Sequence, residues 1–384
     1  MPDFGGYSMS EKDPGWKDLK IKTAEKNALR IKGLPVGRKQ SKLPVIQGGM
    51  GVGISLSGLA GAVASCGGVG LISAAQIGFR RPEFDRDPVS ANIASIKEEF
   101  QKARKIAPEG IIGFNIMVAM HGYETYVKTA AEAGADLIVC GAGLPVDLPA
   151  YTAGTPAALA PVISSARAAE LICRMWKHRY QRLPDLLIVE GPEAGGHLGF
   201  SPEEVEEKGG RRFDEEIKRI LAVAETYGGN EAIPVVLAGG IYDRADVFHA
   251  MEELGATGVQ IATTLVTTEE CDAPSAYKQA YLNAKKEDIV LTKSPVGMPG
   301  RAIRNEFLRR AEKEQIPVKA CHKCLKKCDP TKIPYCITDA LIHAARGEME
   351  DALIFCGSNA WRAEKIERVE DVLRELFPLS FPER

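Results

Sequence analysis

Eight short apolar runs, separated by helical patterns, constrain the fold of this 384-residue chain more than any other feature. Each run ends in small residues, and none shows the apolar–polar alternation of a strand with one wet face. Continuous apolar runs are typical of strands buried on both faces, as in parallel sheets. The runs span residues 43–49, 68–75, 110–118, 136–143, 159–166, 186–191, 233–240 and 258–264.

The segments between these runs predict helices. Residues 89–107 and 166–182 carry apolar side chains at three- and four-residue spacing. Residues 243–256 begin with Asp243, a good N-cap, and reach Gly255 at the C-terminal end. Eight such β–α units predict a TIM (β/α)8 barrel, with an open doubly wound sheet as the structural alternative. The helix between the fourth and fifth runs is expected to be short or missing.

Three parts follow from this pattern. Residues 1–40 form a polar N-terminal extension outside the barrel, and residues 41–300 form the barrel. Residues 301–384 form a C-terminal helical segment with a cysteine cluster and a final amphipathic run, 362–377. A charged insert, 201–214, is long enough to act as a lid or a partner contact.

Composition narrows the function classes. The formal net charge is −2, so no global field favours nucleic acid. The N-terminus lacks the apolar run of a signal peptide, and no apolar stretch reaches the ~18 residues of a membrane-spanning helix. Nine cysteines, an odd number, suit reduced thiols better than a disulfide framework. We therefore expect a cytoplasmic protein that acts on a small-molecule substrate; homo-oligomerisation stays open.

In a barrel of this kind, chemistry is expected at the C-terminal ends of the strands. The glycines and threonines that end the last two runs, 238–240 and 262–264, could cradle a phosphate through backbone amides and a helix N-terminus. No GxGxxG motif follows the first run and no Walker lysine is present, which disfavours Rossmann and P-loop folds. The alternative is that these glycines merely turn the chain.

His197 is the candidate catalytic residue. It follows Glu193, Ala194 and two glycines directly after the sixth run, where an imidazole can titrate near neutral pH. The other interpretation is an ordinary turn residue.

Five motifs together resemble the nitronate monooxygenase family, formerly called 2-nitropropane dioxygenases, which is related to flavin-dependent enoyl-acyl-carrier-protein reductases. They are PVIQGGMG, GFNIMV, EGPEAGGHLG, PVVLAGGI and GATGVQIATTLVTTEE, in this order across roughly residues 40–310. The resemblance implies an FMN-containing TIM barrel. It also implies oxidation of an alkyl nitronate to a carbonyl compound and nitrite, with His197 facing the substrate.

Carried over motif by motif, the resemblance assigns residues to FMN. The residues that would line the flavin ring are Gln47, Gly48, Gly49 and Met50. Those that would contact its polar edge, its ribityl chain or its face are Asn115, Glu190 and Gly195. Those that would hold the ribityl phosphate are Gly239, Gly240, Gln260, Ile261, Ala262 and Thr263. Relatives often have Gln at the position of Glu190 and Gly at that of Ala262, so this chain places a carboxyl group and an extra methyl near the cofactor.

Two further functions share these motifs. The first is an NAD(P)H-dependent flavin reductase that acts on an enoyl thioester or a quinone, instead of an enzyme that uses molecular oxygen. The second is a flavin-binding regulatory protein without turnover, which an intact His197 argues against. Arg301, Arg304 and Asn305 either contact an anionic ligand or serve as helix caps and ion-pair partners. The loop 355–362 resembles a family loop that returns toward the flavin, with Gly357 and Ser358 as weaker candidates.

The cysteine cluster comprises Cys321, Cys324, Cys328 and Cys336. Its CxxCxxxC spacing is tight enough for Zn²⁺ or an iron–sulfur cluster, yet it matches neither common ferredoxin pattern. The alternative is four reduced thiols in a small helical subdomain. No metal ligand is assigned from the sequence.

Overall fold

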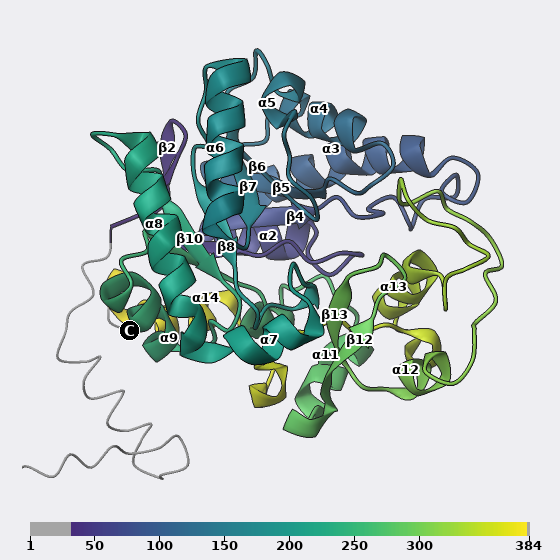
Figure 1. Cartoon of the computed structure of the whole chain (residues 1–384). Helices are drawn as coiled ribbons and strands as arrows, with labels where there is room; N and C mark the ends of the chain where they lie inside the picture. Colours follow the sequence, from purple (N-terminus) through teal and green to yellow (C-terminus); the bar gives the residue numbers. More distant parts are fainter. Residues whose placement is uncertain (1–31, 382–384) are drawn as a thin grey trace, which may run out of the picture.

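The computed structural model describes residues 32–381 and contains a closed barrel of eight parallel strands (Figure 1). The barrel order is β10-β11-β3-β4-β5-β6-β7-β8. The strands are β3 (Val45–Gln47), β4 (Val69–Ser73), β5 (Ile111–Met117), β6 (Leu137–Gly141), β7 (Ala158–Ile163), β8 (Leu187–Glu190), β10 (Val235–Ala238) and β11 (Gly258–Ile261). Seven strands lie within their apolar runs and β7 begins one residue before its run, at Ala158; this match and the closed order confirm the predicted TIM barrel and exclude the open sheet.

Helices surround the strands, as their amphipathic patterns predict. They are α2 (Ser57–Ser65), α3 (Pro88–Ile106), α4 (Tyr123–Glu132), α5 (Leu148–Tyr151), α6 (Ala166–Tyr180), α7 (Pro202–Lys208), α8 (Asp214–Gly228), α9 (Arg244–Phe248), α10 (Thr263–Val266) and α11 (Ser275–Asn283). The expected weak helix between the fourth and fifth strands is α5, with only four residues. The charged insert forms α7 and a 3-10 turn whose Phe213 is buried against Phe200.

The core has two layers, one inside the barrel and one between strands and helices. Ile46, Val69 and Val139 belong to the inner layer. Leu34 and Val36 join this layer from the short hairpin β1 (Pro35–Val36) and β2 (Lys39–Gln40). A Cβ added at Gly258, the first residue of β11, would lie 3.5 Å from Leu34, so the hairpin covers the N-terminal ends of the strands. Only the C-terminal ends are left for a ligand.

The C-terminal part of the chain is connected to the barrel through a second sheet. Its antiparallel strands are β12 (Ile289–Lys293), β13 (Pro299–Ile303) and β9 (Gly196–His197), with Gly300 opposite His197. The remaining helices are α12 (Glu306–Ala311), α13 (Ile337–Arg346) and α14 (Val369–Leu376). In α14, the buried residues 369, 372, 373 and 376 follow helical spacing, as the amphipathic run 362–377 predicts. The loop between α12 and α13 runs along the side of the barrel to the chain before α3 (Figure 1), where His322 stacks on Phe84.

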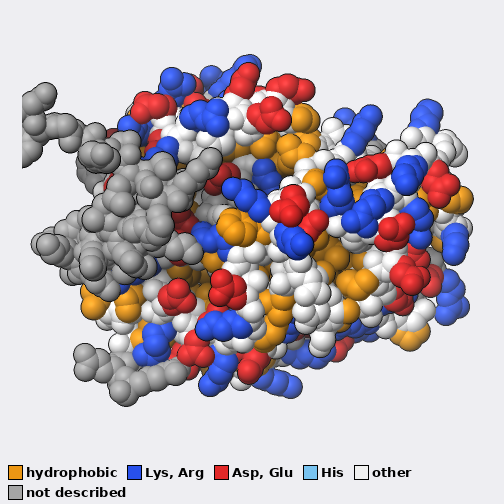
Figure 2. Space-filling view, turned by 90° about the horizontal axis from the view of Figure 1, so that it is seen from below, with side chains coloured by type: hydrophobic (Ala, Val, Ile, Leu, Met, Phe, Trp, Pro, Cys, Tyr) orange, Lys and Arg blue, Asp and Glu red, His pale blue; other side chains and the backbone are white. Residues whose placement is uncertain are grey.

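Figure 2 shows basic and acidic side chains interspersed over the described surface seen from below, in keeping with the small net charge. Within residues 32–381, no helix combines the length and the apolar character needed to cross a bilayer. Most of the predicted N-terminal extension lies outside the described residues. The proposed boundaries at residues 40 and 300 stay predictions.

Candidate active site

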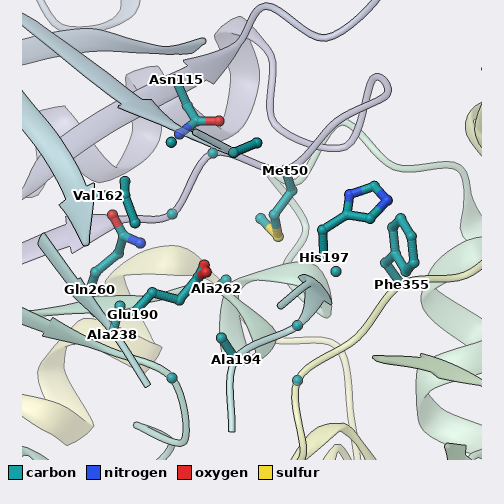
Figure 3. A pocket seen from close by; sticks show the side chains of 18 of the residues that line it. Met50, Asn115, Val162, Glu190, Ala194, His197, Ala238, Gln260, Ala262 and Phe355 are labelled. Atoms are coloured by element: carbon teal, nitrogen blue, oxygen red, sulfur yellow. The ribbon is translucent and has the colours of Figure 1, made fainter. Parts of the chain in front are cut away.

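A cavity of about 520 Å³ lies at the C-terminal ends of the barrel strands (Figure 3). This is within the size range of cofactor and drug-sized ligand sites, ~300–1,000 Å³. In Figure 3, Gln260 and Glu190 lie at one end of the cavity and His197 and Phe355 at the other. The cavity brings together twelve predicted site residues, namely Gly48, Gly49, Met50, Asn115, Glu190, Gly195, His197, Gly239, Gly240, Gln260, Ala262 and Thr263.

Two predicted cofactor residues, Gln47 and Ile261, do not line this cavity. Gln47 is fully buried; its Oε1 accepts a hydrogen bond from Leu71 N at 2.9 Å and its Nε2 donates to Gly48 O. The amide thus extends the β3–β4 pairing, whose register contains a single pair of residues. Ile261 lies between two cavity residues on β11, so strand alternation turns its side chain into the outer core.

His197 lies at the edge of the cavity on β9. Its Nε2 is 2.7 Å from Ser294 Oγ, and its ring meets Phe355 edge to face at 5.0 Å. Burial lowers the pKa of His197 to about 4, so the imidazole is neutral at physiological pH. Sequence reasoning missed Ser294 and identified Phe355 only as part of a loop. Ser294 is 97 residues away in sequence and reaches His197 through the β12–β13 hairpin.

Glu190 and Gln260 form a polar pair at the other end. Both stand in register with Ala238, which lies between them on β10. Burial raises the pKa of Glu190 to about 7, so near neutrality its carboxyl group is about half protonated. Gln260 Oε1 is buried without a hydrogen-bond partner among the described residues. Such a group costs free energy unless a ligand pairs with it.

A glycine turn follows β10. Gly239 and Gly240 have φ of +93° and +80°, a region that L side chains rarely adopt. A Cβ at Gly239 would lie 2.9 Å from Ala194 N, and one at Gly240 would collide with the Glu193 carboxylate. The turn therefore requires glycine for its backbone conformation as well as for close approach of a ligand.

Hydroxyl groups without partners lie near this turn. Thr264 Oγ1 and Ser358 Oγ are buried and have no hydrogen-bond partner within residues 32–381. The preceding Gly357 is so close to Thr263 that an added Cβ would lie 2.5 Å from Thr263 Oγ1. Thr263, Gly357 and the glycine turn line the cavity, and their amides and the Thr263 hydroxyl suit a phosphate monoester, which accepts several hydrogen bonds.

The helix after the glycine turn, α9, begins with backbone amides that its own side chains bind. Asp243 caps α9, as predicted, and accepts from the backbone amides of Ala245 and Asp246. The Asp246 carboxylate accepts from the amides of Tyr242 and Asp243. The amides that begin α9 are thus bonded within the protein, and the predicted contribution of a helix N-terminus to phosphate binding stays a prediction.

The basic segment 301–305 begins within β13, and it was predicted either to contact an anionic ligand or to serve as helix caps and ion-pair partners. Asn305 caps α12 by accepting from Leu308 N at 3.0 Å, and Arg304 pairs with Glu312 at 3.7 Å. Arg301 is buried and donates to Ala194 O, next to the cavity wall. Capping accounts for Asn305 and ion pairing for Arg304, whereas Arg301 bonds a backbone carbonyl and serves in neither way.

The cysteine cluster presents free thiols. All nine cysteines are unpaired, and Cys321 is exposed. Within residues 32–381, no three His, Cys, Asp or Glu side chains are arranged to hold a metal ion. Cys324 instead contributes to the wall of a second, smaller cavity.

Comparisons with known proteins agree with this geometry. A probable nitronate monooxygenase of Staphylococcus saprophyticus is 34% identical over 141 residues, which are 35% of this chain and 36% of that protein. A (3aS,4S,5R,7aS)-5-hydroxy-7a-methyl-1-oxo-octahydro-1H-indene-4-carboxyl-CoA dehydrogenase of Mycobacterium tuberculosis is 26% identical over 70% of this chain and 65% of its own length. The chain thus spans about a third of the first of these curated relatives and about two thirds of the second.

The fold itself is shared with a solved structure. Nitroalkane oxidase from Streptomyces ansochromogenes superposes with a TM-score of 0.67 and 19% identity, covering 88% of this chain and 97% of that one. The sequence profile of the nitronate monooxygenase family matches residues 36–378, which is most of the chain. The predicted resemblance is confirmed: the chain belongs to the nitronate monooxygenase family.

Proposed function

We propose that this protein is an FMN-dependent oxidoreductase that converts alkyl nitronates into a carbonyl compound and nitrite. The observation that carries the proposal is a neutral His197 at one end of a cavity whose other end presents Gln260 Oε1, which has no hydrogen-bond partner among the described residues. Family membership supports the same chemistry, as does the name of the Staphylococcus relative.

The residues present fit FMN. Gly239, Gly240, Thr263 and Gly357, which line the cavity, would hold the phosphate through backbone amides and the threonine hydroxyl. The amide and carboxyl side chains of the cavity would pair with the polar edge of the ring. Bound FMN would supply the redox step, accepting electrons from the nitronate while molecular oxygen supplies the oxygen atom of the product. The role of the protein is to bind, orient and exclude water.

The role of His197 follows from its contacts. Ser294 Oγ accepts from Val296 N at 3.4 Å, and its other lone pair can accept from His197 Nε2 at 2.7 Å. With the proton on Nε2, the lone pair of Nδ1 is free to take a proton from a neutral nitroalkane. When the substrate is already an anion, its charge raises the pKa of the imidazole and favours a protonated ring that hydrogen-bonds the nitronate.

A second candidate is an NAD(P)H-dependent reductase of a thioester substrate. The Mycobacterium relative, which matches most of this chain, is named for a coenzyme A thioester, and this observation favours the candidate. Both functions would use the same cavity.

Anaerobic reduction of the flavin-loaded protein separates the two functions. Purified protein reconstituted with FMN is mixed, without oxygen, with ethyl nitronate or with NAD(P)H, and flavin absorbance is followed by stopped flow. Fast bleaching by the nitronate supports the proposed function, and fast bleaching by NAD(P)H alone supports the second. If neither reagent bleaches the flavin, the protein binds flavin without turnover and both proposals fail.

A further inference from the structure

A second cavity of about 90 Å³ opens beside His197. It shares part of its lining with the main cavity, including His197, Met117, Met298 and Leu341. A molecule that reacts at His197 can therefore extend a chain from the main cavity into this side pocket.

The side pocket is apolar. The residues lining only this pocket include Val52, Met120, Val296, Leu325 and Ile337. Its polar members are few, and the amide oxygen of Gln76 is already bonded to Asn92 at 3.3 Å. A charged or strongly polar group would lose its hydration there without gaining a partner, whereas an alkyl chain would gain from leaving water.

One wall of the pocket comes from outside the repeating barrel, and the other is formed by barrel residues such as Val52 and Met120. The cysteine-bearing segment crosses the loop after β5, where His121 N donates to Cys324 O at 2.9 Å and Lys326 N donates to Ala119 O at 3.0 Å. Between these two bonds, Leu325 lies opposite Met120 in an isolated β-bridge. The start of α13 supplies further apolar side chains. The β12–β13 hairpin, which positions Ser294 against His197, completes the wall.

We propose that this side pocket binds the aliphatic chain of the substrate and selects linear chains of about four to six carbons. At the upper end of the ~10–15 Å³ that a water-sized group needs, the pocket holds roughly six groups the size of a methylene. The reacting carbon then lies beside His197 and the chain points toward Leu325. This inference rests on the proposed function and extends it to a substrate class, the linear primary nitronates.

The first test is a chain-length series with the FMN-loaded enzyme. Nitronates of nitroethane through 1-nitrooctane are compared by kcat/KM under air. Each methylene buried in the pocket is expected to raise kcat/KM roughly fourfold, with a plateau or a fall beyond about six carbons. A series that is flat, or that declines from nitroethane onward, overturns the proposal.

Variants of one hairpin give a matched comparison. Val296 and Val290 are both half-buried in the β12–β13 hairpin, but only Val296 lines the pocket. Val296→Phe is expected to lower the ratio of kcat/KM for 1-nitrohexane to that for nitroethane at least tenfold, and Val290→Phe to preserve this ratio. If Val296→Phe does not fold, Leu325→Ala enlarges the same pocket and should move the optimum toward longer chains. Equal ratios in all folded variants contradict the inference.

A binding measurement separates this inference from the proposed function. Linear 1-alkanols from ethanol to octanol are titrated into the FMN-loaded protein by calorimetry, without any turnover. Affinity that increases with chain length and is lost in Val296→Phe supports the pocket even if nitronates are not oxidised. Nitronate turnover without chain-length dependence in either assay supports the proposed function and refutes the pocket.

Discussion

Replacing Glu190 by Gln tests whether FMN binds only when the carboxyl group of Glu190 is protonated. Glu190 lies at the C-terminal end of β8, in register with Ala238, and burial raises the pKa of its carboxyl group to about 7. If FMN binds only the protonated form, the apparent Kd is the intrinsic value divided by the protonated fraction. The apparent Kd is then about twofold above the intrinsic value at pH 7, about tenfold at pH 8 and about 100-fold at pH 9.

FMN affinity should decrease with rising pH, because burial places the pKa of Glu190 at about 7. The ionised fraction grows as the pH rises through 7, so FMN affinity falls toward alkaline pH. The amide side chain introduced by Glu190→Gln cannot ionise, so the affinity of this variant should stay level between pH 7 and 9. FMN phosphate has its own second ionisation near pH 6, as phosphate monoesters do, and its effect cancels when the two proteins are compared.

The assay is a fluorescence titration of FMN into apoprotein at pH 6, 7, 8 and 9. Glu124→Gln, which removes an exposed carboxylate paired with Lys128 on α4, serves as the control and should follow the wild-type profile. A wild-type affinity that is constant from pH 7 to 9 would refute the reasoning. A tenfold loss of FMN affinity between pH 7 and 9 that persists in Glu190→Gln would refute it as well.

Three other substitutions test the remaining parts of the site. Gly240→Ala should lower FMN affinity at least tenfold but lower the free energy of unfolding by only ~1–2 kcal/mol, because φ of +80° strains any L residue. Flavin content measures the first effect and urea unfolding the second. His197→Ala should retain FMN and lose ~10²–10⁴-fold in rate, more on neutral nitroalkane than on nitronate, and unchanged rates on both would make His197 a turn residue. Ser294→Ala should lower kcat several-fold without changing FMN affinity, and Ser294→Thr should restore it, because the hydroxyl orients His197; equal rates in all three proteins would exclude this role. In the apoprotein, His197 should titrate by NMR with a midpoint at about pH 4, and a midpoint near 6.5 would contradict the burial of the ring. Because the pKa is lower in the folded than in the unfolded state, the free energy of unfolding should decrease as the pH falls from 6.5 toward 4.

The barrel could be predicted from the sequence because its signals are local. Each buried parallel strand must be apolar along its whole length, so runs such as 186–191 and 233–240 mark strands without knowledge of their neighbours. The ends of those strands also fix where chemistry is placed, which is why Glu190, Gln260 and the Gly239–Gly240 turn were found. Even the weakness of α5 was visible as a missing helical pattern.

Local signals did not separate residues that face the cavity from residues beside them. Gln47 and Ile261 stand in the same motifs as their cavity-lining neighbours, yet one completes a strand pairing and the other packs in the core. These outcomes depend on the register between strands and on which hydrogen bonds are already satisfied.

The chemistry of His197 was decided by tertiary structure alone. The glycine turn predicted an imidazole that can titrate near neutral pH, but its pKa of about 4 and its contact with Ser294 arise only when β13 pairs with β9. The side pocket likewise needs residues from the hairpin, the cysteine-bearing segment and α13, which are far apart in sequence from His197. A sequence determines which side chains the strand ends present, because backbone periodicity is local. Burial, electrostatic environment and pocket shape depend on what packs against those side chains, and that is settled only when distant segments fold together.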